Sequence, residues 1–388
     1  MADILRAYGA SFVEHCRARV AWPLHKVMRA IERCRTAALG CHRDRCTQCG
    51  HDFGFSYNSC RNRHCPKCQT QARNQWIAAR TRDLVPLSYF HVVFTVPHQL
   101  SELMLQNKRL LYELLFRSVA MTLMEVAANP EHLGAEIGFL SVLHTWGQTL
   151  MHHPHIHCVV PAGGFAPGRT HWVRPRYPRF FLPKEVLSEL FRGKFTDGLK
   201  CLFRRRKLAF HGSLQWLQEP RSFARFLHTL HRHDWVVYAK KPFGGPEHVL
   251  HYLARYTHRV AISNHRLLRL EDGKVTFRWK DYAHGAKKRQ MTLAAEEFIR
   301  RFLLHVLPKS FVRIRHYGWM ANRCRAERAA LCRTLLDAEP SPSPTSPANP
   351  APARQCPFCG GTIEVVEVVT PRDLPRPRQS RRRDPDSS

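Results

Sequence analysis

The triplet His155-Ile156-His157 is the first feature of the sequence that could do chemistry. It opens an apolar run to Pro161 that is typical of a β-strand, in which side chains two residues apart point to the same face. Two imidazoles held in this way on a rigid support can bind one divalent cation. The chain has 25 histidines, however, so such a triplet also arises by chance. A metal site therefore needs further support.

A pair of tyrosines is the second such feature. Tyr252 and Tyr256 lie four residues apart on a predicted helix over 247–261, so they share one face of it. A tyrosine hydroxyl can act as a nucleophile and form a covalent intermediate. Arg255 and Arg259 lie beside the pair and could neutralise a phosphate. The alternative is that the tyrosines are ordinary core residues and the arginines are solvated helix surface.

Two pairs of cysteines predict a structural zinc site. Cys46 and Cys49 are separated from Cys65 and Cys68 by residues 50–64. This is the spacing of a four-thiolate zinc module, in which two intervening residues let both thiolates of a turn reach one tetrahedral ion. Cysteines buried in reduced form are the alternative, but these rarely occur as two spaced pairs.

Other residues around this module allow more than one interpretation. A second zinc site, or an exchange of ligands with the first, could use the remaining Cys41, His42, Cys60 and His64. Arg61 and Arg63 could contact phosphate, or they could be solvated surface charges.

The elements that must position these residues predict an α+β fold. The run Tyr89–Val96, which Pro97 ends, predicts a buried strand that could lie beside the histidine strand. Residues 139–160 predict two strands with a break near His152. Asp272-Gly273 predicts a hairpin turn. Helices are expected over residues 1–40, 71–82, 99–127, 184–210, 247–261 and 294–306, and a further strand over 235–238.

The charge of the chain predicts a polyanionic partner. The 388 residues include 61 Lys and Arg against 30 Asp and Glu, giving a net charge of +31. Phosphates neutralised by such a surface release counterions, which favours nucleic acid. No apolar run is long enough to cross a membrane, and the first 20 residues contain no signal-peptide core. The 14 cysteines are clustered as in a reducing compartment, so we expect a cytoplasmic protein without a membrane partner.

The order of these features resembles the HUH endonucleases, and most closely their two-tyrosine rolling-circle transposases of the insertion-sequence 91 type. The resemblance runs from about residue 10 to about residue 325. The segments that carry it are Asn58-Ser-Cys-Arg-Asn-Arg-His-Cys-Pro-Lys-Cys-Gln69, Phe94-Thr-Val-Pro97, His144-Thr-Trp-Gly-Gln148, His153-Pro-His-Ile-His157 and Tyr252-Leu-Ala-Arg-Tyr-Thr-His-Arg-Val260.

This resemblance implies an antiparallel sheet flanked by helices, preceded by a zinc module. It implies that His155 and His157 bind Mg²⁺ or Mn²⁺, although the pair could also hold Zn²⁺. Gln148 is the predicted third ligand, with His251 and His258 as rivals. The substrate would be single-stranded DNA at the ends of a mobile element, cut and rejoined through a 5′-phosphotyrosine without a nucleotide cofactor.

The sequence predicts four regions. These are a helical and zinc-binding module (1–82), a nuclease domain (83–310), a helical extension (311–336) and a disordered Pro/Ser/Arg-rich tail with a CxxC pair (337–388). A plasmid-type replication initiator or relaxase, and a noncatalytic zinc-dependent DNA-binding protein, are the alternative functions. A zinc hydrolase has less support, because the sequence contains no His-Glu-x-x-His segment.

Overall fold

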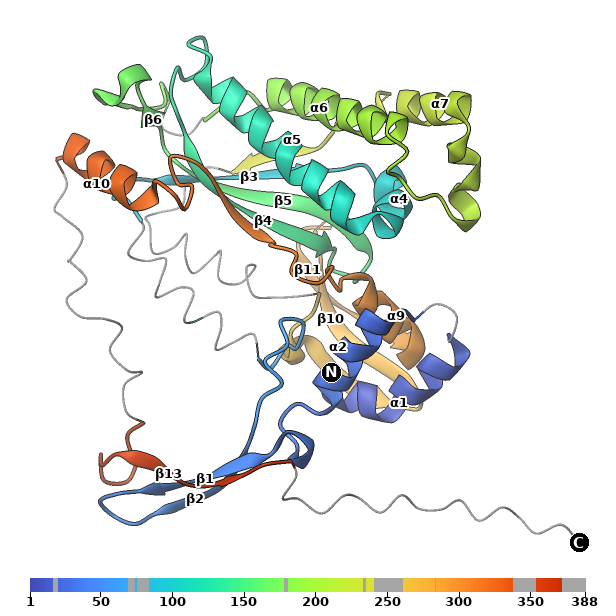
Figure 1. Ribbon diagram of the computed structural model, residues 1–388, viewed down its shortest axis with the longest axis vertical. Coiled ribbons are helices and arrows are strands. Elements are labelled where there is room, and N and C mark those ends of the chain that lie inside the picture. The colour runs from blue at the N-terminus through green and yellow to red at the C-terminus, as the bar shows by residue number, and fades with distance from the viewer. Residues whose placement is uncertain are drawn as a thin grey trace, which may run out of the picture.

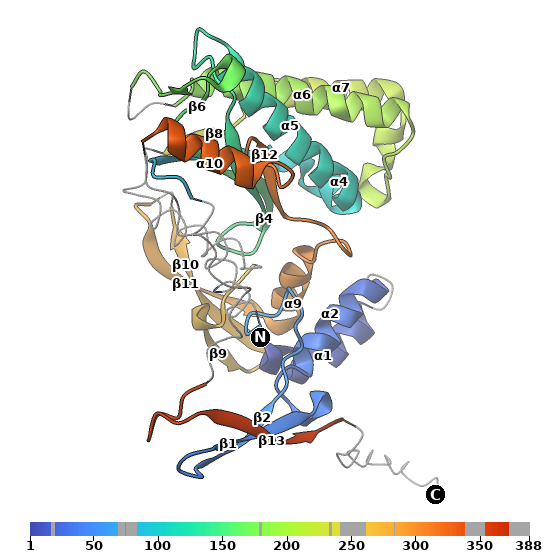
Figure 2. The same ribbon diagram turned by 60° about the vertical axis from the view of Figure 1, so that its left-hand side comes forward.

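The computed structural model describes residues 1–16, 20–68, 74, 84–177, 181–232, 235–240, 261–282, 284–337 and 354–371. Figures 1 and 2 show three units, one above another. A large unit is built on a five-stranded sheet, a second unit combines a hairpin sheet with helices, and a third is a small sheet that contains both an early and a late strand. Among the described residues, no helix has the length and apolar character needed to span a membrane.

The large unit is built on an antiparallel sheet with the histidine strand at its centre. Its strand order is β12-β4-β5-β3-β8, so β5 is bonded to a neighbour on each side. Pro97 follows the end of β3, as expected. The strands are β3 (Tyr89–Thr95), β4 (Gly138–Trp146), β5 (His152–Pro161), β8 (Val237–Lys240) and β12 (Ile314–Gly318).

Helices cover one face of this sheet. Side chains alternate along a strand, so Phe94 and Ile156 point into a core that also holds Leu115, Phe116 and Phe191 of the helices, all completely or almost completely buried. The helices that form this layer are α4 (Ser101–Gln106), α5 (Lys108–Ala128), α6 (Lys184–Arg204) and α7 (Pro220–Leu230) (Figure 1).

The opposite face is covered by a second apolar cluster at one end. Tyr89, Leu140 and Val159 pack there with Trp319 and Cys332. Further along β4 and β5, the same face of the sheet carries His144, His155 and His157. The elements around the cluster are α10 (Arg325–Leu335) and the short strands β6 (Gly164–Phe165) and β7 (Trp172–Val173).

The second unit joins the N-terminal helices to a later part of the chain. Phe298 of a helix in the late segment packs in one core with Leu5 and Phe12. The hairpin turn at Asp272-Gly273 has positive φ at both residues, 49° and 72°, as the sequence predicts. The elements are α1 (Ala2–His15), α2 (Trp22–Glu32), β9 (Leu267–Glu271), β10 (Lys274–Asp281), β11 (Lys287–Ala294) and α9 (Ala295–Leu304).

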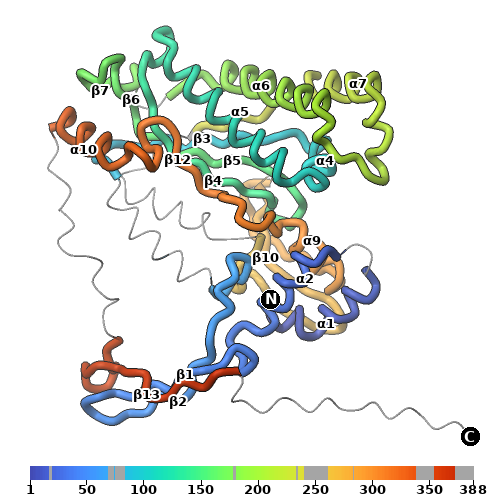
Figure 3. The backbone as a smooth tube through the Cα atoms, in the orientation of Figure 1, coloured from blue at the N-terminus to red at the C-terminus, as the bar shows by residue number. Residues whose placement is uncertain are grey.

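The third unit pairs two early strands with a late one. Strand β1 (Cys41–Cys46) lies between β2 (Asp52–Tyr57) and β13 (Ile363–Val369), and both pairings are antiparallel. Figure 3 shows the red C-terminal strand lying along the blue N-terminal ones. Short 3₁₀ helices complete the described chain at Ala37–Leu39, His98–Leu100, Pro167–Arg169, Gly212–Gln218 and Asn264–Arg266.

Several expectations about the elements need correction. A disordered tail from 337 onward is wrong for residues 354–371, because β13 gains a hydrogen-bonded partner in β1. The extension 311–336 is not all helical, since β12 completes an edge of the large sheet. The break between the histidine strands lies at 147–151, and His152 is already in β5. The predicted helices over 71–82 and 247–261 lie outside the described residues, apart from Asn74 and Ala261.

Candidate active site

Three histidines converge on the sheet face opposite α5 and α6. His155 and His157 alternate along β5 with Ile156, which points into the helix-covered core. His144 of β4 lies directly opposite His155 in the register. One ring nitrogen from each of the three lies within 4.8 Å of the others. His144 and His157 are buried, 2% and 8% exposed, and His155 is half-buried.

Hydrogen bonds fix the orientation of two of these rings. His155 Nδ1 lies 2.7 Å from the carbonyl oxygen of His153 and therefore donates to it. His157 Nδ1 lies 2.7 Å from Nε2 of His91 on β3. Nε2 of His155 is then the nitrogen that can bind a cation, and the same holds for His157 in the tautomer whose Nδ1 donates to His91, the arrangement typical of metal-binding histidines.

Burial keeps the His155 ring in the form that a metal requires. Desolvation lowers the pKa of His155 to about 4. The ring is therefore neutral at neutral pH, and a neutral imidazole is the form that ligates metals.

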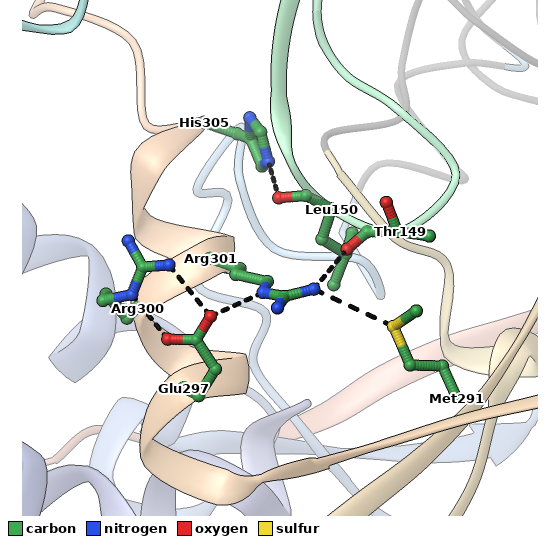
Figure 4. A network of polar contacts seen from close by, with 7 residues as sticks. All are labelled: Thr149, Leu150, Met291, Glu297, Arg300, Arg301 and His305. Atoms are coloured by element: carbon green, nitrogen blue, oxygen red, sulfur yellow. Dashed lines mark hydrogen bonds and ion pairs between the residues drawn. The ribbon is translucent and has the colours of Figure 1, made fainter. Parts of the chain in front are cut away.

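The turn between the two histidine strands is held by the second unit. Arg301 of α9 donates to the carbonyl oxygen of Thr149 at 3.1 Å, and His305 Nε2 lies 3.0 Å from that of Leu150 (Figure 4). Glu297 accepts from Arg301 at 2.6 Å and from Arg300 at 2.6 Å, which orients both guanidinium groups. The link between β4 and β5 is thus fixed from outside the sheet.

Gln148, the predicted third ligand, lies in this turn. Its side-chain oxygen accepts from the backbone N–H of Lys280 at 3.4 Å, and its backbone carbonyl accepts from Arg266 at 2.6 Å. Both contacts tie Gln148 to the second unit. His144 is the candidate ligand that sequence reasoning missed. His144 faces the same side of the sheet as His155 and His157. The sequence shows this only when the register between β4 and β5 is known.

The predicted nucleophiles lie in a segment outside the described residues. This segment contains Tyr252 and Tyr256, the neighbouring Arg255 and Arg259, and the rival ligands His251 and His258.

The cysteines form two groups, in place of the predicted single site. Cys65 and Cys68 lie with Cys34 and Cys60, whereas Cys46 and Cys49 lie with Cys356 and Cys359. Cys46 ends β1 and Cys49 lies in the turn to β2, whereas Cys34 lies two residues after the end of α2. Local spacing identified both pairs but could not identify their partners.

The first group fits a zinc ion. Its sulfurs approach at 3.5 Å (Cys34–Cys68 and Cys60–Cys68) and 3.6 Å (Cys34–Cys65). Four sulfurs about 2.3 Å from a tetrahedral ion lie about 3.8 Å apart, whereas a disulfide requires about 2.05 Å. A hydrogen bond from Cys60 lowers the pKa of Cys65, which favours a thiolate.

The structure does not assemble the expected second site from Cys41, His42, Cys60 and His64. Cys60 belongs to the first cysteine group. Cys41 is buried at the start of β1, and His42 lies 3.6 Å from Asp44. His64 is buried as a structural residue, accepting from the Leu307 N–H at 3.2 Å.

Arg61 and Arg63 differ in their surroundings. Arg61 is exposed. Arg63 donates to the carbonyl oxygens of Phe311 at 2.7 Å and Pro308 at 2.9 Å. Its guanidinium therefore attaches the cysteine-rich segment to the chain that leads into β12.

Comparison with known proteins gives matches to both halves of the chain. Residues 138–328 match a family model described as "Putative transposase", and residues 4–96 match one described as "Transposase zinc-binding domain". No solved structure matches.

Two relatives are similar over most of their length. The chain is 52% identical over 386 residues to "Putative transposase y4qJ" of Sinorhizobium fredii, covering 95% of this chain and 96% of that protein. It is 29% identical over 315 residues to "Transposase for insertion sequence element IS801" of Pseudomonas savastanoi pv. phaseolicola, covering 80% and 74%.

Proposed function

Because this chain belongs to the transposases of the insertion-sequence 91 family, we propose that it nicks and rejoins single-stranded DNA at the ends of a mobile element through a 5′-phosphotyrosine. The observation that supports this chemistry is the convergence of His144, His155 and His157 on one face of the central sheet. A noncatalytic DNA-binding protein has no need of such a group. Since DNA is the substrate, we place the protein in the cytoplasm.

The three histidines would hold one divalent cation. Three imidazoles, with water or phosphate oxygens completing the shell, fit Mn²⁺ better than Mg²⁺, because Mg²⁺ prefers oxygen ligands. When bound, the ion would polarise the scissile phosphate and stabilise its developing charge. His91 and the carbonyl of His153 act as positioning groups, because they fix which ring nitrogen of His157 and His155 faces the cation.

The tyrosines supply the nucleophile in this proposal. The hydroxyl oxygen of Tyr252 or Tyr256 bonds to phosphorus and its proton passes to solvent. The bond from phosphorus to the 3′ oxygen breaks, and that oxygen takes up a proton as the free 3′-hydroxyl. The phosphodiester energy is kept in the phosphotyrosine, so rejoining is the reverse reaction and needs no nucleotide cofactor.

The zinc module would position DNA instead of cutting it. Cys34, Cys60, Cys65 and Cys68 would close all four positions of a structural Zn²⁺, and a closed site leaves no place for a substrate. Arg61 next to Cys60 is exposed and available to phosphate, as Arg255 and Arg259 would be beside the tyrosines.

His157→Ala tests the proposed function. The variant is expected to bind a single-stranded element end as the parent does, because binding rests on many phosphate contacts, but to form no covalent protein–DNA adduct on a denaturing gel. The matched control is His228→Ala, an exposed histidine on α7, in the layer on the other side of the sheet. Adduct formation by His157→Ala, or by the parent after chelation of divalent ions, would refute the metal-dependent mechanism.

A further inference from the structure

The C-terminal segment carries half of the second cysteine group. Cys46 Sγ lies 3.5 Å from Cys359 Sγ, and Cys49 Sγ lies 3.8 Å from Cys356 Sγ. All four sulfurs lie within 4.8 Å of one another. We propose that these cysteines bind a second structural zinc ion, which joins an early segment of the chain to a late one. The match to the zinc-binding domain ends at residue 96, so two of the four ligands lie far outside it.

Both cysteine pairs have the same local geometry. The carbonyl oxygen of Cys46 accepts from the N–H of Gly50 at 3.1 Å, and that of Cys356 accepts from Gly360 at 2.8 Å. The two glycines have φ of 69° and 75°, a conformation that side chains other than glycine rarely adopt. Each turn therefore presents its two sulfurs toward the same side, as a zinc ligand pair requires.

The second turn also approaches the first closely. Gly361 donates its N–H to Cys359 Sγ at 3.4 Å. A Cβ atom added at Gly361 would lie 2.6 Å from Cβ of Gln48 and 3.1 Å from Sγ of Cys46. Only glycine lets the backbone of the C-terminal turn pass this close to the sulfurs of the other pair.

Contacts around the sulfurs hold the two segments in register. Arg354 makes a bidentate ion pair with Asp44 at 2.7 and 2.8 Å, and Asp44 is only 2% exposed. The backbone N–H of Thr47 donates to the carbonyl oxygen of Thr362 at 2.9 Å. These polar contacts align the four sulfurs without any residue of the large sheet.

The small sheet has too little apolar core to explain its own stability. No described residue of β1, β2 or β13 belongs to the apolar clusters on either face of the large sheet or to the core of the second unit. Phe358 and Val368 are instead 70% and 67% exposed. Small units of this kind need an added constraint such as a metal or a disulfide. Sulfur separations of 3.5 and 3.8 Å fit the edges of a zinc tetrahedron and exceed a disulfide bond.

The zinc content of the full chain tests this proposal. All chains in this test carry His157→Ala, so that the three-histidine site cannot add a zinc ion to the count, and the parent in this background is expected to hold two zinc ions per chain. Cys46→Ser/Cys49→Ser and Cys356→Ser/Cys359→Ser should each hold one. The matched control, Cys201→Ser/Cys324→Ser, removes two thiols that belong to neither group and should keep two ions. Two ions in Cys356→Ser/Cys359→Ser, or a single ion in the parent, would overturn the proposal. The count does not depend on DNA cleavage, so it stands or fails separately from the transposase chemistry.

A comparison of two single variants separates lost ligation from misfolding. Cys359→His keeps a zinc ligand at the position and should retain two ions, whereas Cys359→Ser should lose one. Equal loss in both variants would count against a ligand role.

Cleavage of the chain between the units gives a second measurement. A protease site inserted between residues 340 and 350 leaves a C-terminal fragment that contains Cys356 and Cys359. This fragment should stay with the rest of the protein on a sizing column and leave it after chelation of zinc. Release of the fragment with zinc still present would contradict the proposed tie.

Discussion

His144 and Gln148 are rival candidates for the third protein ligand of the proposed cation. The structure places His144 with His155 and His157, whereas the side-chain oxygen of Gln148 accepts from Lys280. His144→Ala should therefore abolish adduct formation and weaken Mn²⁺ binding by about 10-fold or more, since one of three protein ligands is lost. Gln148→Ala should leave most Mn²⁺ affinity intact.

Calorimetric titration of Mn²⁺ into each variant measures this directly. The two affinities are compared with that of the parent, and the gel assay for the adduct is run on the same samples. A larger loss of affinity in Gln148→Ala than in His144→Ala would restore the assignment made from the sequence.

Three buried histidines make stability depend on pH. Burial lowers the pKa of His64, His152 and His305 to about 3, against about 6.5 in the unfolded chain. The unfolded state therefore binds more protons in acid, so stability is complete above about pH 6.5 and falls as the pH drops toward 3. Each group can contribute up to about 1.4 kcal/mol per pH unit within that window.

Urea unfolding between pH 7 and pH 5.5 checks the sign and the source of this dependence. The unfolding midpoint of the parent should fall with pH, and His305→Gln should show a shallower slope because one titrating group is gone. A slope that is unchanged in this variant would mean that His305 does not contribute.

Among the elements, β11 offers an exposed basic edge. Lys287 and Lys288 are exposed, and their charges would meet a DNA backbone. Lys287→Ala/Lys288→Ala should weaken binding of single-stranded DNA equally for all sequences. If each lysine contacts one phosphate, the slope of log K against log salt should decrease by about 1.4, at about 0.7 for each contact.

Fluorescence anisotropy over a series of salt concentrations measures this slope. The matched control is Lys184→Ala/Lys200→Ala, which removes two exposed lysines of α6, in the layer on the other side of the sheet from the histidines. An equal change in both double variants would show that only overall charge matters.

The helix predicted over 247–261 carries the other essential test. Tyr252 and Tyr256 would lie about 6 Å apart along its axis, at about 1.5 Å per residue, so a modest shift of the helix could exchange them. Phenylalanine keeps the ring and removes only the hydroxyl. Tyr252→Phe or Tyr256→Phe alone should abolish transposition but leave some cleavage, with the larger effect from Tyr256→Phe.

The double variant is the decisive one. Tyr252→Phe/Tyr256→Phe should form no covalent adduct on a single-stranded end. An adduct in this variant would place the nucleophile elsewhere in the chain.

The elements themselves could be predicted where a local pattern specifies them. The apolar run of β3, the alternation around His155 and the Asp272-Gly273 turn each depend on neighbouring residues, and all three were predicted. The position of His144 depends on the register between β4 and β5. The edge strand β12 depends on a partner far away in the sequence. Local spacing does not contain that information.

At the scale of the whole molecule, the cysteines show the same limit. The spacing of Cys46, Cys49, Cys65 and Cys68 is equally compatible with one shared site or with two separate ones. What decides between them is which other thiols the fold brings near, and those are Cys34, Cys60, Cys356 and Cys359. Cys356 and Cys359 follow a Pro/Ser-rich stretch, and the composition of this region predicted disorder. The strand after them, β13, nevertheless pairs with β1.

The pairing of β1 with β13 also means that the small sheet can form only late in synthesis of the chain. Cys46 is synthesised 313 residues before Cys359, an interval of roughly 15 to 60 s at about 5–20 residues per second. Throughout that interval Cys46 and Cys49 have only half of their proposed ligand set. A chain that ends before Cys356 would leave the proposed second zinc site incomplete even if its large sheet has folded. Completion of this site would therefore distinguish chains that extend past Cys359 from shorter products.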